Sequence, residues 1–227
     1  MMKGYGYPDQ SELRALMDSL VDDSSVKGVL NVFASPGGSV AGTADYGDAV
    51  AALSASKPCY AYCEDMCASA AYWAASLCSK IFANSTALVG SIGVISWLTD
   101  ATKMYEEMGI KDIPITTGKF KVAGDPSQAA TPEIIDYMQS TIDAIFGEFV
   151  GQVAKGRGLS AKKIKEMEAK VFMGQEAVEQ GLVDKICSID EAFNSVLRAT
   201  NNGGKSHKAM IDLCDLEMAS IDMGIKI

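Results

Sequence analysis

The stretch DMCASAAYW, residues 65–73, places a single serine where a buried strand is expected to give way to a helix. The strand is expected at PCYAYC, residues 58–63, and three alanines surround Ser69. A hydroxyl on such a turn is exposed and backed by a helix N-terminus, and small neighbours would let a carbonyl group come into contact with it. Taken alone the pattern is weak, because most small-residue helices pack closely on a neighbouring element instead.

A second buried strand precedes this one. The run GVLNVFA, residues 28–34, is typical of a strand covered on both faces. It ends abruptly in SPGGSV, residues 35–40, where two glycines permit backbone angles that other residues avoid. A helix is expected over 43–54, so the order strand, helix, strand, helix predicts a parallel sheet with right-handed crossovers. Functional turns gather at the carboxyl ends of such strands, so we expect the glycine turn and the Ser69 turn at the same edge.

The rest of the chain continues the alternation. A first amphipathic helix is expected after Ser11, which the pattern suggests as its N-cap. We expect one α/β domain over residues 1–200, followed after the NNGG sequence by a poorly anchored tail over 201–227. The remaining patterns predict short strands at 80–83, 87–95, 112–116, 171–173 and 182–187. They also predict a short basic helix after the break at 156–158 and helices at 70–78, 98–108, 132–155, 175–180 and 190–198.

The composition excludes several classes of function. A chain of 227 residues with 48% hydrophobic residues can bury one good core. A net charge of −9 argues against a nucleic-acid surface, because Lys and Arg clusters supply most contacts to phosphate. No run approaches the length of a membrane span, and residues 1–8 lack the pattern of a signal peptide, so we expect a cytoplasmic protein.

The cysteines are expected to be free thiols that act as small buried hydrophobes. No CxxC pair occurs and the chain has one histidine, so neither a zinc site nor any other cofactor is expected. The six residues are Cys59, Cys63, Cys67, Cys78, Cys187 and Cys214.

A serine hydroxyl is a poor nucleophile unless a base takes its proton. The one histidine, His207, lies in the expected tail, which excludes a Ser-His-Asp triad within the core. A lysine held in its neutral form by burial or by nearby positive charge is the remaining candidate. Lys119 and Lys121 share a loop rich in small residues, and the residues alone do not choose between them. A solvated loop lysine is the ordinary alternative for both.

Backbone amides of the Gly37–Gly38 turn and of Ala70, the residue after the serine, could form an oxyanion hole. The same glycine turn could instead be needed for shape alone. It could also cradle a phosphate, although it lacks the ending of a P-loop and the spacing of a dinucleotide fingerprint.

Four motifs follow one another along the chain: SPGGSV at 35–40, ASAAY at 68–72, VGSIGV at 89–94, and GKFK at 118–121 followed by Asp125 and Pro126. Together they resemble the signal peptide peptidase A family, in particular its short phage branch, the head maturation proteases. The likeness runs from about Lys27 to Ala192. It implies an α/β fold of the crotonase and Clp-protease kind, with repeated strand-strand-helix units and a mainly parallel sheet.

The resemblance implies a Ser-Lys dyad and resolves the choice of base against Lys119. Peptides of this superfamily typically bind as an added strand. The implied site consists of the nucleophile Ser69, the general base Lys121, the hydroxyl of Ser91 that orients the lysine amine, the oxyanion donors Gly38 and Ala70, and the substrate-binding backbone of Ser39, Val40, Ile92 and Gly93.

The resemblance also implies a ring-like homo-oligomer, because in single-domain members the serine and the lysine of one site come from adjacent protomers. Peptides or unfolded proteins are the implied substrates, with no nucleic acid and no membrane segment in this chain. The family normally has a strand and a turn before the first helix, so we expect this chain to lack its first strand.

We therefore expect a serine endopeptidase that acts through an acyl-enzyme, either signal-peptide-peptidase-like or capsid-processing. Two alternatives stay open. A crotonase-like acyl-CoA hydratase or isomerase would use Glu64 or Asp65 as its acid or base. A non-catalytic assembly protein would keep the fold for ring formation alone.

Overall fold

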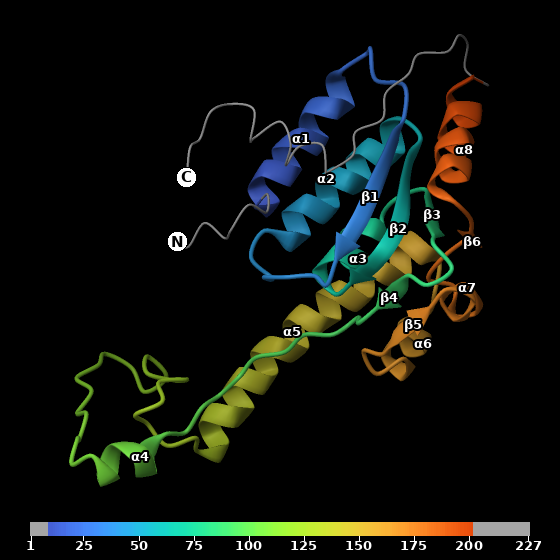
Figure 1. Cartoon of the computed structure of the whole chain (residues 1–227). Coiled ribbons are helices and arrows are strands. Elements are labelled where there is room, and N and C mark those ends of the chain that lie inside the picture. The colour runs from blue at the N-terminus through green and yellow to red at the C-terminus, as the bar shows by residue number, and fades with distance from the viewer. Residues whose placement is uncertain (1–8, 202–227) are drawn as a thin grey trace, which may run out of the picture. The chain divides into compact units, whose positions relative to one another are not determined.

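The computed structural model describes residues 9–201 and divides into two compact units (Figure 1). The first unit combines the chain up to Ile92 with the chain from Phe149 onward, and the second is Gly93–Glu148. The domain boundaries expected from the sequence stay a prediction, since residues 202–227, which include His207, lie outside the described part.

The sheet belongs to the first unit, and α4 belongs to the second. Helix α5, Pro132–Arg157, runs from the second unit into the first. The strands are β1 (Val29–Ser35), β2 (Cys59–Ala68), β3 (Lys80–Ala83), β4 (Leu88–Gly90), β5 (Val171–Met173) and β6 (Lys185–Ile186), and the other helices are α1 (Gln10–Asp22), α2 (Thr43–Ser56), α3 (Ala70–Ala75), α4 (Thr102–Glu107), α6 (Ala161–Glu166), α7 (Gln175–Gln180) and α8 (Ile189–Asn201).

The sheet is mostly parallel and is centred on β2. Strand β2 pairs in parallel with β1, β3 and β4, and β6 pairs in parallel with β3. The one antiparallel pair among the described strands is β4 with β5. The prediction of an α/β fold with a mainly parallel sheet is therefore confirmed.

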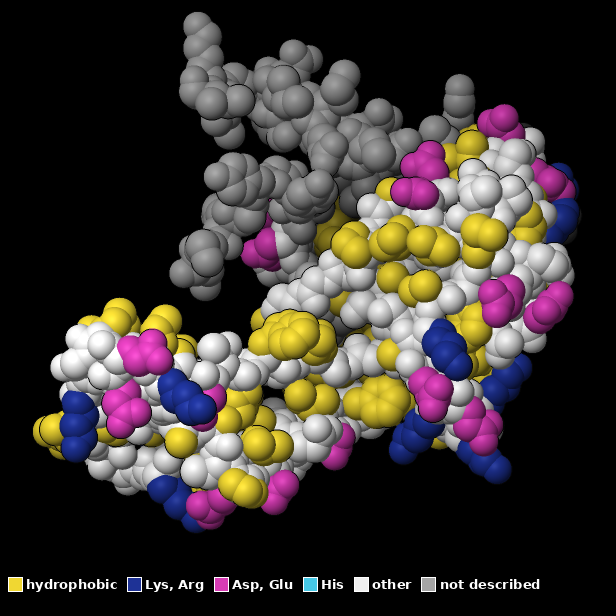
Figure 2. Space-filling model, turned by 60° about the horizontal axis from the view of Figure 1, so that its bottom comes forward, with side chains coloured by type: hydrophobic (Ala, Val, Ile, Leu, Met, Phe, Trp, Pro, Cys, Tyr) yellow, Lys and Arg dark blue, Asp and Glu magenta, His cyan; other side chains and the backbone are white. Residues whose placement is uncertain are grey.

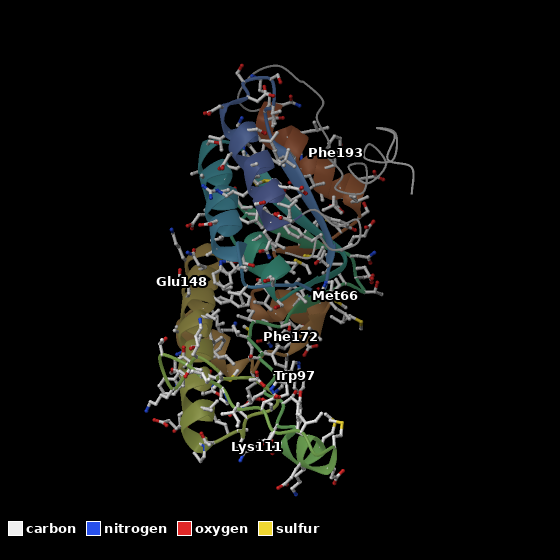
Figure 3. The ribbon with its side chains drawn as sticks, turned by 90° about the vertical axis from the view of Figure 1, so that its left-hand side faces the viewer. Met66, Trp97, Lys111, Glu148, Phe172 and Phe193 are labelled. Atoms are coloured by element: carbon white, nitrogen blue, oxygen red, sulfur yellow. The ribbon has the colours of Figure 1, made fainter. Side chains whose placement is uncertain are left out.

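Helices cover both faces of this sheet (Figure 1). Helices α2 and α3 lie on one face and α1 packs on α2, whereas α8 lies on the other face. Alternate residues of β1 and β2 form a core with α8, and Phe193 of α8 packs against it (Figure 3). The buried members of this core are Leu30, Val32, Tyr60, Tyr62, Phe82, Ala192 and Val196.

The opposite face of β2 carries the thiols. Cys59, Cys63 and Cys67 are buried on this strand, and Cys78 follows α3. The Asn31 side-chain amide on β1 donates to Cys59 Sγ over 3.2 Å. Burial raises the pKa of the Cys67 thiol, and a hydrogen bond with Cys59 together with burial raises that of Cys78. The prediction of free thiols holds for these four and for half-buried Cys187, while Cys214 lies outside the described residues.

Strand β2 is longer than its pattern predicts. The apolar run suggests an end at Cys63, but the strand continues to Ala68. Its second half leaves β3 and pairs with β4, and β1 rejoins it where Ser35 lies opposite Cys67 beyond an irregularity in the register. The acidic residues at 64–65 suggest a turn in the sequence. In the structure they belong to the strand, and both of their side chains face solvent. Ser69 consequently follows the last residue of β2 directly.

Helix α1 also starts differently from its prediction. Its N-cap is Asp9 rather than Ser11, because the Asp9 carboxylate accepts from the N–H groups of Ser11 and Glu12. The Glu12 carboxylate accepts in return from the Asp9 N–H, which completes a capping box. The first residue of the helix is therefore Gln10.

The second unit differs most from the sequence expectation. The alternating run at 112–116 forms no strand and is fully solvent-facing, with Ile115 98% exposed. None of the residues 93–148 is buried, and hydrophobic side chains are visible on the surface of this unit (Figure 2). Asp100 connects two loops of this unit, because its carboxylate accepts hydrogen bonds from the N–H and hydroxyl of Thr102 and from the N–H of Ala130. The bond from the Thr102 hydroxyl is the main cause of the lowered pKa of Asp100.

Several remaining elements match their predicted spans and others are shorter. Strand β5 and helix α7 coincide with the prediction, while α3, α4, β4 and β6 cover only part of the predicted ranges. Strands β4 and β6 end opposite Ala68 and Ala83, the last residues of their partner strands β2 and β3.

Lys57 closes the far end of α1, and its replacement tests how firmly this helix is held. Its ammonium donates to the carbonyl oxygens of Leu20, Asp23 and Val26 over 2.6, 3.0 and 3.2 Å. Lys57 is only half-buried, so water can replace part of what the three carbonyls lose, and Lys57→Met should lower the free energy of unfolding in urea by about 1–3 kcal/mol, less than three fully buried charged hydrogen bonds would contribute. The control Lys155→Met, at an exposed position of α5, should change it by less than about 0.5 kcal/mol. Equal losses in the two variants would contradict the capping role.

Candidate functional site

Ser69 occupies a strained position between β2 and α3. Its backbone has φ +53° and ψ −126°, which places a non-glycine residue at a positive φ. Its N–H donates to the Gly90 carbonyl over 2.9 Å, and its carbonyl accepts from the Trp73 N–H over 3.0 Å. The side chain is half-buried. The neighbouring main chain therefore holds the serine in a conformation that it would not adopt alone.

Ser91 lies beside Ser69 at the same edge of the sheet. Ala68 pairs with Gly90 in the register of β2 and β4, so the two serines are the residues that follow this pair. Ser91 also has a positive φ of +51°, and its N–H donates to the Lys170 carbonyl over 2.9 Å. Two neighbouring strand ends thus turn away from the sheet through strained serines.

The glycine turn after β1 packs against the Ser69 turn. A Cβ atom at Gly37 would lie 2.6 Å from the Ser69 Cβ, 2.8 Å from the Ala68 carbonyl oxygen and 2.9 Å from the Ala70 nitrogen. Gly37 itself has φ +102°. No larger residue fits here, so the absence of a side chain is what lets the two turns touch.

Two backbone amides next to this contact are available for a ligand. Among the described residues none accepts a hydrogen bond from the Gly38 N–H, and a Cβ at Gly38 would meet no atom within 4 Å. Ala70 is the first residue of α3, so its N–H has no partner within the helix. Both amides belong to residues next to the contact between Gly37 and the Ser69 turn, and their role as oxyanion donors stays a prediction.

Helix α3 is anchored by two aromatic residues. The Tyr72 hydroxyl donates to the Leu182 carbonyl over 2.8 Å, and full burial raises the pKa of this phenol. Trp73 stacks on Phe149 with ring centroids 4.7 Å apart. These contacts hold in place the short helix that begins directly after Ser69.

The predicted substrate-binding residues are divided between the units. Ser39 and Val40 are exposed in the loop that leads to α2, and Ile92, the last residue of the first unit's leading segment, is 1% exposed. Gly93 is the first residue of the second unit. If a substrate peptide binds as an added strand, it would pair with the main chain of these residues and not with their side chains.

Both candidate lysines belong to the second unit. Lys119 forms an ion pair with Glu133 and lies 4.9 Å from the centroid of the Phe120 ring, which stacks on Tyr137. Lys121 is exposed in a series of tight turns, its N–H donating to the Gly118 carbonyl over 3.0 Å. The structure thus brings Ser69 together with Ser91, Gly37 and Ala70 in the first unit, while the lysine of the predicted dyad stays a prediction.

Sequence reasoning missed the carbonyl groups that hold this site. The Lys170 carbonyl receives the Ser91 N–H, and the Leu182 carbonyl receives the Tyr72 hydroxyl. No sequence signal marks a backbone acceptor, since every residue carries one. Glu64 and Asp65, considered as an acid or base, are exposed within β2 (Figure 3 labels the next residue, Met66, together with Phe172 of β5).

Residues 9–201 contain no group of three or more His, Cys, Asp and Glu side chains that could hold a metal ion. Over the same range no helix combines the length and apolar character needed to cross a membrane.

Comparison with known proteins gives a family. Residues 51–201 match the model of peptidase family S49. The chain is 35% identical over 188 residues to the head-tail preconnector protein GP5 of Enterobacteria phage P21, covering 83% of this chain and 38% of that protein. It is 33% identical over 192 residues to the capsid assembly protease C of Escherichia phage lambda, covering 85% and 44%. It is 30% identical over 182 residues to protease 4 of Haemophilus influenzae, covering 79% and 29%. The chain thus spans less than half the length of each of these three relatives.

The contact at Gly37 can be tested through stability alone. Gly37→Ala forces a methyl group against the Ser69 turn at a positive φ, and should lower the free energy of unfolding by about 2–4 kcal/mol. The matched control Gly38→Ala, where a Cβ would enter open space, should change it by less than about 1 kcal/mol. Urea unfolding followed by circular dichroism measures both, and similar values for the two variants would refute the close packing of the turns.

Proposed function

The chain belongs to peptidase family S49, and from this premise we propose that it is a serine endopeptidase with a Ser-Lys dyad. The observation that carries the proposal is the packing of the glycine turn on the Ser69 turn, next to two main-chain N–H groups without a partner of their own among the described residues. Serine peptidases need this combination because the carbonyl oxygen of the substrate becomes negatively charged during attack.

In the proposed reaction the Ser69 Oγ attacks the carbonyl carbon of the scissile peptide. The Gly38 and Ala70 N–H groups stabilise the oxyanion, and the neutral amine of Lys121 takes the proton of the hydroxyl. The lysine then gives this proton to the leaving amine as the C–N bond breaks. Water, activated by the same amine, hydrolyses the acyl-enzyme and restores the serine, and Ser91 orients the lysine amine throughout.

The surroundings of the two lysines favour Lys121 as the base. The Lys119 ammonium is engaged with the Glu133 carboxylate, so its recruitment as a base would require this ion pair to break. Within its own unit, whose residues are all described, no carboxylate lies at ion-pair distance from Lys121, so this side chain is free to be recruited.

We further propose that the site is completed in a ring-like homo-oligomer, in which a second copy covers Lys121. A lysine acts as a base only when it is neutral, and burial favours the neutral form, yet Lys121 is exposed in the single chain. The second unit has no buried residue and leaves Trp97 83% and Ile113 73% exposed. Figure 3 labels Trp97, and Figure 2 shows hydrophobic side chains on the surface of this unit. A unit that exposes this many large hydrophobic side chains and buries none is typical of a part that another protein covers.

The proposed substrates are peptides and unfolded segments of proteins, which would add a strand along the backbone of the predicted substrate-binding residues. The names of the two phage relatives concern capsid assembly and the head-tail preconnector, which supports processing of phage structural proteins as the proposed role. Unstructured segments suit this mode because their main-chain groups are free to pair.

The nucleophile is tested with an unstructured protein substrate such as casein and a fluorogenic peptide library. Ser69→Ala should lower the cleavage rate by at least about 10³-fold, because the covalent route is lost while binding remains. The control Ser19→Ala, at an exposed position of α1, should retain the wild-type rate. Activity that survives in Ser69→Ala would refute the assignment.

The sharing of the dyad is tested by mixing two inactive variants. Ser69→Ala and Lys121→Ala should each be inactive, but chains refolded together at equal concentration should recover about one quarter of the wild-type rate, the share of sites that join an intact serine to an intact lysine. Lys119→Ala serves as the matched control and should retain activity. If the mixture stays inactive while wild-type protein is active, the dyad does not form between copies.

A further inference from the structure

Gln10, the first residue of α1, connects this helix to the loop that follows the glycine turn. Its Nε2 donates to the Ser39 carbonyl oxygen over 2.8 Å and to the Thr43 hydroxyl over 2.8 Å. The Thr43 hydroxyl donates in turn to the same carbonyl over 2.8 Å. Three polar groups thus close a ring that joins α1, the loop and the first residue of α2.

The chemistry of this ring fixes its orientation. A carbonyl only accepts, so the amide atom of Gln10 that faces Ser39 must be the NH₂ group, because an oxygen there would be repelled. Two donors occupy both lone pairs of the Ser39 carbonyl. The peptide unit is planar and trans, so a fixed Ser39 carbonyl also fixes the direction of the Val40 N–H on the opposite side.

A second feature of the loop makes room for this side chain. Gly42 has φ +82°, and a Cβ there would lie 3.1 Å from Gln10 Oε1 and 3.2 Å from Gln10 Cβ. Thr43 is 1% exposed, so the inner partner of Gln10 is itself firmly held. The glycine after Ala41 therefore serves the approach of Gln10 as well as the start of α2.

We propose that Gln10 is a positioning residue that fixes the peptide plane between Ser39 and Val40, and with it the register in which a substrate peptide adds its strand beside the oxyanion donor Gly38. This inference rests on the proposed function. It assigns to α1, far from Ser69 in the sequence, control over binding of the peptide main chain but not over the acylation chemistry.

The test separates binding of the peptide main chain, which Gln10 should affect, from acylation of Ser69, which it should not. Gln10→Ala should lower kcat/KM for a peptide substrate about 5- to 10-fold, since the strand is no longer held in register. The rate of acylation by p-nitrophenyl acetate, a small ester that needs Ser69 and the oxyanion donors but cannot pair with residues 39–40, should stay within about twofold. Gln10→Glu, which keeps the shape but places a carboxylate oxygen at the Ser39 carbonyl, should show the same selective loss.

Two further variants keep the test decisive. The control Gln175→Ala removes the glutamine that opens α7, which is exposed, and should leave both rates unchanged. Gly42→Ala should displace the Gln10 side chain and reproduce the selective loss with Gln10 still present.

The outcomes separate this inference from the proposed function. A selective loss for the peptide in the Gln10 variants supports the positioning role. Equal losses for the peptide and the ester, or no loss for either, overturn it while the peptidase assignment stands. Wild-type protein that cleaves neither substrate overturns the proposed function and this inference with it.

Discussion

The contact between Gly37 and Ser69 is the constraint on which the site depends. Because only a hydrogen atom fits between the two turns, the main chains after β1 and β2 come into direct contact. The register of Ala68 with Gly90 adds the end of β4 to the same place. Three strands from separate parts of the sequence therefore bring the glycine turn, Ser69 and Ser91 to one edge of the sheet, where parallel sheets generally carry their functional residues.

Strain at this edge is balanced by main-chain hydrogen bonds. Positive φ values at Ser69 and Ser91 each cost about 1–3 kcal/mol and persist only where the surroundings enforce them. The Gly90 and Lys170 carbonyls do so, by accepting the N–H groups of the two serines. The rigid fit means that little reorganisation of the donors would be needed when charge develops on a bound carbonyl.

The sequence predicts most of the sheet because buried parallel strands are short apolar runs between turns, as in β1 and β3. It does not predict that β2 continues through Glu64 and Asp65, since the exposed middle of a strand looks like a turn when its pairing partners are unknown. The strand predicted at 112–116 is wrong for the opposite reason. Its alternation is correct for a strand, but Pro114 lacks an N–H and no neighbouring strand in the described chain pairs with it.

The candidate site, like the sheet, combines features that the local sequence reveals with features that depend on distant contacts. A serine between small residues and a glycine turn are local patterns, so the sequence reveals them, whereas the bonds from Gln10 to Ser39 and Thr43 join positions 29 and 33 residues apart and leave no local signal. The donors around Ser69 are held entirely by contacts within the first unit. The proposed base lies on a unit that buries none of its own side chains, and a lysine needs a covered environment to lose its proton. On the proposed assignment, the burial that completes the surface of the second unit is therefore the same event that makes Lys121 a base, so that assembly and activation would not be separable steps.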